Sequence, residues 1–503
     1  MNLFEHSIAA ISPEWAAKRA YFRAVLAANE AMQSRKYDAA SRDRRTGKWN
    51  APSTGPNAEI AGAVARIRDR GRDLVRNNPH AATAPRKLAA KIVGKGIFPR
   101  LAVEDAKQRA AAKDIWDRFA DHSDVEGLTD FYAQQHVAAR CFIECGEFLV
   151  RWTVPPKAAG SVFPLQCSIL EPDFLDNDKN ETIADGGAII QGVQYDAFGR
   201  RVGYWLYPEH PGESLAAFTR RVAASSFVPA SECDHVLDQL RPGQARGVSM
   251  FAASALSLRD IEDYKDAEMM RRKIAACFAV FRRPPQGNAA SPMTRDTSTD
   301  AKGNTIQNVS PGAIYDMKAG EDVSFSTPPR VESLADTLRF ELRAVAAGIG
   351  MTYEQMTGDL TGVNFSSIRI GVNDFLDVRD HWREHVFLPM MLRKSWRRVG
   401  RIAAIAGYRK FGDPWADRWI YPRDRMLSPI DDVEAAKDAA RALLRDPLDV
   451  IAEFSGEDPL DIIDGAAQLN KLLDDNDLTS DIDPRKVGRT STPSPQAAAK
   501  PAN

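Results

Sequence analysis

Residues 357–369 have the sequence TGDLTGVNFSSIR, which is the most informative stretch of the chain. Ahead of it, leucine, valine and isoleucine recur at helical spacing over residues 334–349, which predicts a helix with one buried face. A second long helix is expected over residues 366–406. Because two glycines and several hydroxyl side chains lie between these helices, we expect a mobile polar loop there.

Length and composition are typical of a globular protein with more than one domain. The chain has 503 residues, of which 44% are hydrophobic and 27% are charged. It contains no run of about 18 apolar residues and no signal-peptide pattern, so we predict neither a transmembrane helix nor a leader. Five irregularly spaced cysteines argue against a disulfide framework and favour a reducing compartment.

The net charge of −1 conceals two oppositely charged regions. Residues 41–100 carry fourteen Lys and Arg against four Asp and Glu, whereas residues 411–483 carry seven against nineteen. Solvated helix faces would explain any single patch. The asymmetry along the whole chain suggests two surfaces with different functions.

Hydrophobic periodicity predicts a mainly helical α+β chain with one β-rich stretch. Pro389 should kink the long helix in which it lies. Further helices are expected at residues 12–34, 58–77, 82–93, 130–145 and 250–276, and another around residue 116. Short acidic helices are expected over residues 432–475, with breaks at Pro447 and Gly456. Strands are expected at residues 147–154, 165–170, 189–195 and 201–206, with a hairpin turn at 196–199, and the β-rich domain should close near residues 231–237. Residues 277–330 should form a small β-containing module, with strands at 278–283, 313–317 and 322–325 and a flexible polar stretch at 286–308.

The sequence contains no motif for catalysis. It has no P-loop, no dinucleotide-binding glycine pattern, no nucleophile elbow and no carboxylate pair typical of a nuclease. His381 and His385 have the spacing of two metal ligands, but Glu384 is misplaced for a metalloprotease, so paired or solvated histidines are favoured. Cys141 and Cys145 are interpreted as small buried hydrophobic residues. We therefore predict no catalytic residue, metal or cofactor, and a binding, structural or mechanical function.

Six segments in a fixed order resemble the lambdoid family of tailed-phage portal proteins. The most distinctive is AAGIGMTYEQMTGDLTGVNFSSIR at residues 346–369. The others are RDRGRDLVRNNPHA at 68–81, KIVGKGIFP at 91–99, RPGQARGVSMFA at 241–252, DIEDYKDAEMMRRKIAA at 260–276 and PGAIYDMKAGEDVSFSTPP at 311–329. The resemblance covers about residues 20–475 and depends on the order and spacing of the segments.

The resemblance implies a portal fold with wing, stem, clip and crown regions that assembles as a ring, usually a dodecamer. Along the chain it implies residues 1–248 as wing, 249–276 as first stem helix, 277–330 as clip, 331–350 as second stem helix, 351–365 as tunnel-loop region, 366–429 as kinked helix and return to the wing, 430–480 as crown-side helices and 481–503 as a disordered tail.

The resemblance also implies a non-enzymatic function. Such a ring is the channel at one capsid vertex through which double-stranded DNA is packaged and ejected, and it is a docking site for terminase and head–tail connector proteins. The implied partners are further copies of the chain, DNA in transit, the terminase large subunit, a connector or adaptor, the major capsid protein and a scaffold or protease, without a membrane. The implied location is the virion portal vertex, with host cytoplasm during assembly.

Two sets of site residues follow from the resemblance. The tunnel loop facing DNA would comprise Thr357, Gly358, Asp359, Leu360, Thr361, Gly362, Val363, Asn364 and Phe365. The clip would contact partners through Arg282, Arg283, Pro284, Tyr315, Lys318 and Glu321. A loop with one acid suits sliding DNA, because each neutralised phosphate adds salt-dependent affinity. The basic segment, with Arg66, Arg68 and Arg72, is therefore expected to be an outer or intersubunit surface.

Two alternatives stay open at the level of sequence. A nucleic-acid enzyme or recombinase with a basic N-terminal arm is disfavoured by the missing Walker motif and carboxylate cluster. Another oligomeric capsid or head–tail connector component is the second alternative, and the order of long helix, small module and long helix distinguishes a portal from a typical shell protein.

Overall fold

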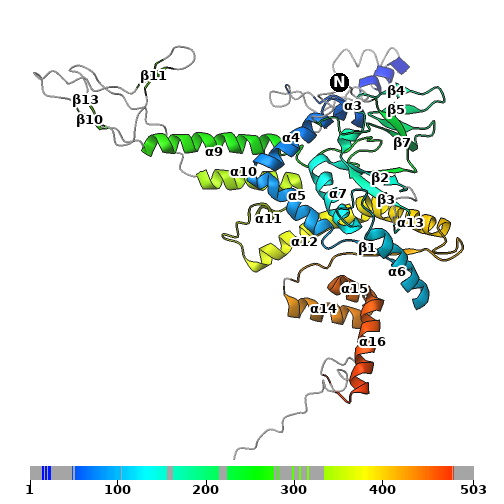
Figure 1. The fold of residues 1–503 in the computed structure, drawn as a ribbon. Helices are drawn as coiled ribbons and strands as arrows, with labels where there is room; N and C mark the ends of the chain where they lie inside the picture. Colours follow the sequence, from blue (N-terminus) through cyan, green and yellow to red (C-terminus); the bar gives the residue numbers. More distant parts are fainter. Residues whose placement is uncertain are drawn as a thin grey trace, which may run out of the picture. The chain divides into compact units, whose positions relative to one another are not determined.

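The computed structural model describes residues 14–15, 17–19, 21–23, 48, 51–103, 105–155, 162–213, 224–276, 280–282, 297–299, 305–307, 314–316, 334–426, 428–478 and 480. It divides into two compact units, Met1–Gly55 and Pro56–Asn503. Residues 14–15, 17–19 and 21–23 of the first unit are helical, in agreement with the predicted helix. The second unit carries all labelled helices and strands (Figure 1). Within the described chain, no helix is both long and apolar enough to cross a bilayer.

The second unit begins with a series of helices: α3 (Pro56–Ala61), α4 (Val64–Asn77), α5 (Pro79–Ile92), α6 (Ala106–Ala120) and α7 (Phe131–Cys145). The helix predicted over residues 58–77 is thus two helices, α3 and α4. The predicted stop at Pro79 is confirmed, and it is also the start of α5. The Asn78 side chain caps α5 by accepting the backbone N–H groups of His80 and Ala81, and Pro79 occupies the first turn, where no N–H is needed.

The β-rich stretch forms two antiparallel sheets. In the first, β2 (Glu147–Thr153) lies between β3 (Gln166–Leu170) and β9 (Cys233–Leu237). The second has the order β4 (Glu181–Thr182), β5 (Ala188–Ile190), β6 (Val193–Tyr195), β7 (Arg201–Leu206) and β8 (Ser226–Pro229).

Two turns define the second sheet. The single strand predicted at residues 189–195 is a hairpin, because Gln191 and Gly192 both have positive φ and reverse the chain. The hairpin predicted at 196–199 is confirmed between β6 and β7. A pairing that sequence periodicity did not predict joins β1 (Phe98–Leu101) to β14 (Asp417–Ile420).

Two long helices, α9 (Ala255–Ala276) and α10 (Leu334–Ile349), pack side by side (Figure 1). Helix α9 starts later than predicted because residues 250–254 form turns, in which Ser249 accepts the backbone N–H of Phe251. Of the module between the helices, β10 (Val280–Arg282) pairs in parallel with β13 (Ile314–Asp316). The stretch predicted to be flexible and polar contains an antiparallel pair, β11 (Thr297–Thr299) with β12 (Thr305–Gln307).

The long helix predicted after residue 366 is continuous but changes its winding. It runs through α12 (Phe365–His381), a π-helical segment (Trp382–Leu392) and α13 (Arg393–Ile405). Pro389 lies in the π-helical segment. Proline lacks an N–H and its ring collides with the carbonyl four residues earlier, and a wider turn relieves both problems. The predicted irregularity therefore takes the form of a widened helix.

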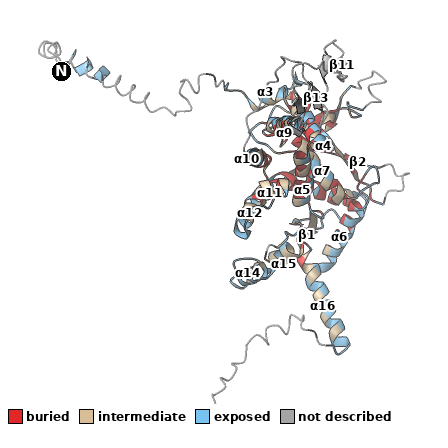
Figure 2. Cartoon of the chain, turned by 90° about the vertical axis from the view of Figure 1, so that its left-hand side faces the viewer, coloured by how far each residue is buried: buried red, intermediate tan, exposed pale blue. Residues whose placement is uncertain are grey.

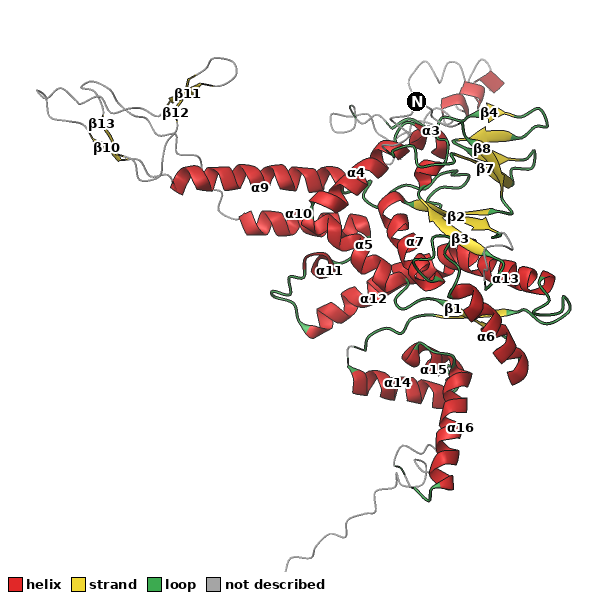
Figure 3. Cartoon of the chain, viewed as in Figure 1, coloured by secondary structure: helices red, strands yellow, loops and turns green. Residues whose placement is uncertain are grey.

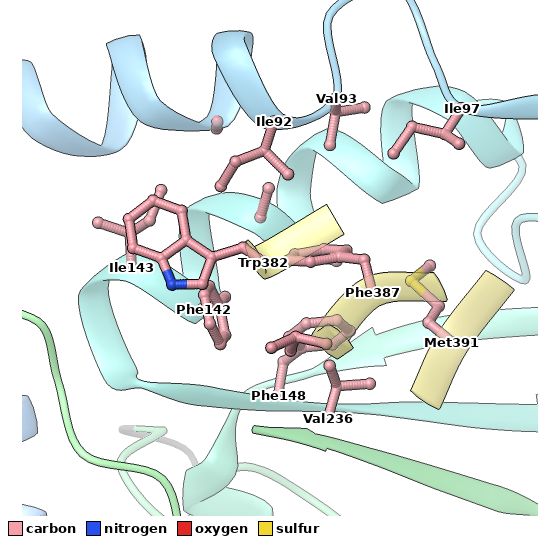
Figure 4. Packing of buried hydrophobic residues seen from close by; sticks show 14 of the residues in the cluster. Ile92, Val93, Ile97, Phe142, Ile143, Phe148, Val236, Trp382, Phe387 and Met391 are labelled. Atoms are coloured by element: carbon pink, nitrogen blue, oxygen red, sulfur yellow. The ribbon is translucent and has the colours of Figure 1, made fainter. Parts of the chain in front are cut away.

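The π-helical segment crosses the centre of the core (Figure 4). The ring of Phe387 packs against Phe142 of α7 and Phe148 of β2, with ring centroids 5.4 and 5.7 Å apart. Trp382 also contacts Phe142 edge-on. The segment thus joins the helical layer to the three-stranded sheet. Buried residues concentrate in these elements, whereas α12 and α14 are mostly exposed (Figure 2).

Three helices lie near the end of the described chain: α14 (Pro429–Arg441), α15 (Pro447–Ser455) and α16 (Pro459–Asp475) (Figure 3). Both predicted breaks are confirmed. Asp446 caps α15 ahead of Pro447, and Gly456 ends that helix in the left-handed conformation. The predicted disordered tail, residues 481–503, lies outside the described residues.

Candidate functional site

The loop over residues 358–364 joins the short helix α11 (Tyr353–Thr357) to α12. Helix α11 was not predicted, although Thr352 and Gln355 form a capping box that could have revealed it. Gly358 and Gly362 both have a φ of 76°, and a Cβ at either position would meet no atom within 4 Å. These glycines are therefore needed for backbone conformation, not for space.

Asp359 ties the first half of this loop to the helices beside it. Its carboxylate accepts hydrogen bonds from the Thr361 backbone N–H (3.0 Å) and the Tyr353 hydroxyl (2.9 Å), and lies 3.5 Å from Arg339 of α10. Hydrogen bonds from Thr361 and then Tyr353, with the charge of Arg339, lower the pKa of Asp359 to about 2. The carboxylate is therefore ionised and engaged, so this half of the loop is anchored.

Apart from Asp359, the loop and the first residue of α12 present apolar and uncharged polar groups. Leu360 is 62% exposed and Phe365 is 56% exposed. Asn364 caps α12 by accepting the Ser367 N–H, and Ser367 accepts the Asn364 N–H in return. Residues 357–365 contain no cation. The loop thus combines a fixed base with a tip that offers no positive charge.

Helix α10 supports the loop through Arg339, and α10 packs closely against the start of α9. The Ser254 hydroxyl donates to the carbonyl of Val345 at 3.2 Å, and a Cβ on Gly348 would overlap that hydroxyl. Farther along α9, Glu268 accepts from both Arg271 and Arg272. Glu268 thereby offsets part of the positive charge of Arg271, Arg272 and Lys273 at the end of α9.

Two of the six predicted clip residues lie on described strands. Arg282 and Tyr315 lie on β10 and β13, one register position apart, because Phe281 opposes Tyr315 and Arg282 opposes Asp316. Their side chains are not described. Arg283, Pro284, Lys318 and Glu321 lie outside the described residues.

A buried ion network, which the motif analysis missed, joins the two sheets. Arg246 and Glu147 are both fully buried and pair at 2.7 Å, and Arg246 also bonds the carbonyls of Pro172 and Gln191. Glu147 in turn accepts the backbone N–H of Gly247 at 2.6 Å. The sequence analysis included the segment RPGQARG only in the family resemblance. Its second arginine, Arg246, joins β2 to the residues around the second sheet.

His235 on β9 completes this network in its neutral form. Arg201 can only donate, so Nδ1 of His235 accepts from it (2.9 Å), and Nε2–H donates to Glu147 (2.8 Å). Burial lowers the pKa of His235 to about 4 in spite of Glu147. Burial also opposes ionisation of Glu147, but Arg246 and His235 outweigh it and hold the pKa of that carboxyl well below its usual value.

The basic segment is less available than its sequence suggested. Arg68 is 3% exposed and pairs with Asp173 at 3.0 Å, and Arg72 pairs with Glu171 at 2.7 Å. The prediction of an outer or intersubunit surface is therefore wrong for these two arginines, which hold α4 to the turn at 171–173. His210 also lies beside both carboxylates. Because guanidinium groups already occupy these acids, this cluster is an ion-pair network and not a metal centre.

The remaining residues considered for metal chemistry are explained by packing. The rings of His381 and His385 lie 5.3 Å apart, and His381 approaches Asp238 at 3.7 Å. This matches the paired histidines that were favoured. Cys145 is buried and Cys141 partly buried, as expected for small hydrophobic residues.

The acidic region over residues 411–483 is held by ion pairs, two of which, Lys95–Glu457 and Arg100–Asp458, come from the basic region over residues 41–100. The acidic helices α14–α16 meet cations of the preceding elements in the pairs Lys95–Glu457, Arg100–Asp458, Lys113–Asp461, Arg369–Asp432 and Arg418–Asp449. Few apolar side chains of these helices are buried. Ion pairs therefore contribute to holding this acidic region against the rest of the unit.

Comparison with known proteins gives consistent matches. The model of the lambda family of phage portal proteins matches residues 42–383. The probable portal protein of Halomonas phage phiHAP-1 is 25% identical over 505 residues, covering 95% of this chain and 91% of that protein. Portal protein B of Escherichia phage lambda is 23% identical over 372 residues, covering 65% of this chain and 66% of that protein.

Solved structures of particle necks also align with the chain. The neck of a native gene transfer agent particle, computed with C12 symmetry, gives a TM-score of 0.39 at 12% identity and covers 81% of this chain and 96% of that one. The neck of an empty particle, computed with C6 symmetry, gives 0.40 at 15% identity, with coverages of 79% and 92%.

Proposed function

Because this chain belongs to the lambda family of phage portal proteins, we propose that it assembles into a ring whose central channel passes double-stranded DNA during packaging and ejection. The family match is the observation that carries this proposal. The ring is a structural component of the capsid portal vertex, is assembled in the host cytoplasm and has no enzymatic activity of its own. Twelve subunits is the number that the family resemblance suggests.

The loop over residues 358–364 is the proposed tunnel loop. Duplex DNA binds protein largely through phosphate contacts with Lys and Arg, and each contact makes binding tighter and more dependent on salt. A channel wall that must let DNA slide therefore needs few free cations. The described loop fits this requirement, because it contains none and its single carboxylate is already engaged by Thr361 and Tyr353.

The remaining regions follow in the order that the resemblance implies. We assign α9 and α10 to the paired stem helices and residues 277–330 to the clip between them. The helix from α12 to α13 returns to the wing, and α14–α16 form the crown-side region. Terminase large subunit and a head–tail connector dock on the clip, through residues that include Arg282 and Tyr315. The major capsid protein and a scaffold or protease are the other proposed partners.

Negative-stain electron microscopy of the purified full chain tests the assembly. Rings with a central hole wide enough for duplex DNA are expected. Monodisperse monomers with nuclease activity would instead favour the nucleic-acid enzyme. A ring or stack without a continuous hole would favour a different head–tail connector component.

Deletion of residues 358–363 tests the tunnel loop. Rings should still form, because α10 and α12 are retained, but packaging or genome retention should fail. Phe198→Ser provides the control, since Phe198 is 82% exposed in a turn that the proposal leaves outside the channel. Normal titres of full particles after the deletion would exclude a channel role for this loop.

A further inference from the structure

A half-enclosed cavity of about 750 Å³ lies where several parts of the second unit meet. Its lining residues come from α5 and the turn after it, from α11 and α12, from the extended segment 422–425 and from the end of α15. This volume falls within the range of about 300 to 1,000 Å³ that is usual for binding clefts. No residue of the loop 358–364 lines it, so the proposed channel does not account for it.

Cations from two separate segments line this cavity. Lys87 and Lys91 lie four residues apart on α5, and therefore on one face of that helix, and Lys95 follows in the next turn. Arg423 and Arg425 belong to the extended segment, where alternate side chains point to the same side. The cavity is therefore strongly basic.

The two carboxylates that line the cavity are already engaged. Asp424 pairs with Arg379 of α12, behind the cavity wall, and Glu457 pairs with Lys95 at 3.5 Å. Within the described chain, neither carboxylate forms an ion pair with Lys91.

Three of the lining cations lack a partner. Within the described chain, no hydrogen bond or ion pair is found for the side chains of Lys91, Arg423 or Arg425. Lys91 is only partly exposed, so solvent does not fully replace the missing partner. The charge of these groups is available to a ligand.

Arg383 adds a buried positive charge to the same wall. It is 4% exposed, and its guanidinium donates to the backbone carbonyls of Ile92 and Lys91 at 2.7 Å. The nearest carboxylate, on Asp380, is 3.7 Å away and exposed. Burial, together with the charge of Arg379, lowers the pKa of Arg383 to about 10. A buried cation whose hydrogen bonds go to neutral groups favours an anion nearby.

The floor of the cavity is apolar. Leu88, Met351 and Phe375 line it and are 1%, 6% and 3% exposed. Duplex DNA receives protruding protein elements in its grooves, of which the major groove is about 12 Å wide, and does not enter a cavity of this size. Carboxylates beside apolar side chains, carried on a segment of polypeptide, match both the cations and the floor.

We infer that the cavity receives a carboxylate-bearing segment of a second copy of this chain. The inference rests on the ring assembly proposed above. A closed ring uses heterologous contacts, so each copy needs an acceptor surface and a different donor surface. Donor groups are present on α9, where Asp260 and Asp266 are exposed and have no ion-pair or hydrogen-bond partner among the described residues. The same helix exposes Leu256 and Met270, which supply apolar contact.

Zero-length carbodiimide cross-linking tests the contact directly, because it joins a lysine amine only to a carboxylate that touches it. Rings are assembled from equal amounts of ¹⁴N-labelled and ¹⁵N-labelled chains and analysed by mass spectrometry. Mixed-isotope peptides that join Lys91 to an Asp or Glu are expected. Two results would overturn the inference. In the first, Lys91 is cross-linked only to residues of its own chain. In the second, Lys91 is not cross-linked at all, although the Lys113–Asp461 pair within one chain is.

A charge-removal variant tests the energetic contribution. The triple substitution Lys91→Gln, Arg423→Gln and Arg425→Gln should weaken subunit association by roughly tenfold for each cation removed, measured as the concentration at which rings dissociate. Wild-type rings should also dissociate more readily as salt is raised. The control substitutes three exposed cations outside the cavity whose side chains have no partner among the described residues, in Arg397→Gln, Arg401→Gln and Lys410→Gln, and should assemble as the wild type does.

The outcomes separate this inference from the proposed function. If the wild type forms no rings, the ring proposal itself fails. If wild-type and triple-variant rings are equally stable, or if the control is weakened to the same degree, the cavity is not a specific subunit contact. A triple variant that assembles normally but loses affinity for a fluorescent 30-base-pair duplex would assign the cavity to DNA instead. Circular dichroism confirms that each variant is folded before comparison.

Discussion

His235→Gln should remove a pH-dependent loss of stability from the sheet that contains β2 and β9. In the folded chain the pKa of His235 is about 4, against an ordinary value of 6.5. The unfolded chain therefore binds a proton more readily between these two values. The stabilisation is complete above about pH 6.5 and is lost as pH falls towards 4.

The size of the effect follows from this difference in pKa. At pH 5 the imidazole is almost fully protonated in the unfolded chain but stays neutral in the fold, where it donates to Glu147 and accepts from Arg201. The free energy of unfolding this sheet therefore falls by about 2 kcal/mol between pH 7 and pH 5. This corresponds to roughly a 30-fold loss of protection of its backbone amides against hydrogen exchange. A glutamine amide offers both a donor and an acceptor but does not titrate.

Hydrogen exchange followed by mass spectrometry provides the assay. Protection factors of peptides that cover β2 and β9, corrected for the pH dependence of intrinsic exchange, should fall roughly 30-fold from pH 7 to pH 5 in the wild type. They should change far less in His235→Gln, whatever its absolute stability. His122→Gln, at an exposed histidine, should behave as the wild type does. Equal pH dependence in the wild type and His235→Gln would refute the neutral, buried imidazole described here.

Three further outcomes are expected. Gly247→Ala should destabilise the unit by about 3 kcal/mol or lead to insoluble protein, because a Cβ would overlap the Gly146 carbonyl in a buried backbone contact, and a lowered melting temperature would show it. Arg100→Ala should lower the free energy of unfolding by about 2 kcal/mol, because it leaves the half-buried carboxylate of Asp458 unpaired. Helix α16 should then become sensitive to protease at salt concentrations that the wild type tolerates. Unchanged cleavage would contradict the ion-pair contact. Asp359→Asn should speed amide exchange within residues 358–364 without changing the melting temperature, since it weakens contacts that hold only the loop.

Local signals in the sequence predicted many of the elements correctly. The hydrophobic repeat over residues 334–349 predicted α10, and Pro447 and Gly456 marked both ends of α15. These predictions succeed because caps, breakers and periodicity act over a few residues. The errors are also local: the hairpin at Gln191 has a positive φ in a non-glycine residue, which alternation of side chains does not reveal.

The sequence located the candidate loop, but it did not predict that the acid of the loop is anchored. Residues 357–365 were recognised as a polar loop with one acid, and the expected mobility followed from two glycines. Contact with Arg339 on another helix anchors that acid. No spacing rule predicts such a contact, because it depends on how α10 and α11 pack.

The sequence by itself determined the family, the order of long helices and strands, and the absence of cations in the loop. Only the tertiary structure decided which charges meet. Arg246 finds Glu147 across about a hundred residues, Arg68 and Arg72 turn inward to Asp173, and Lys91 is left beside a cavity without a partner. Helix and strand signals are short-range, whereas the pairing of a charge depends on desolvation and on packing between distant segments.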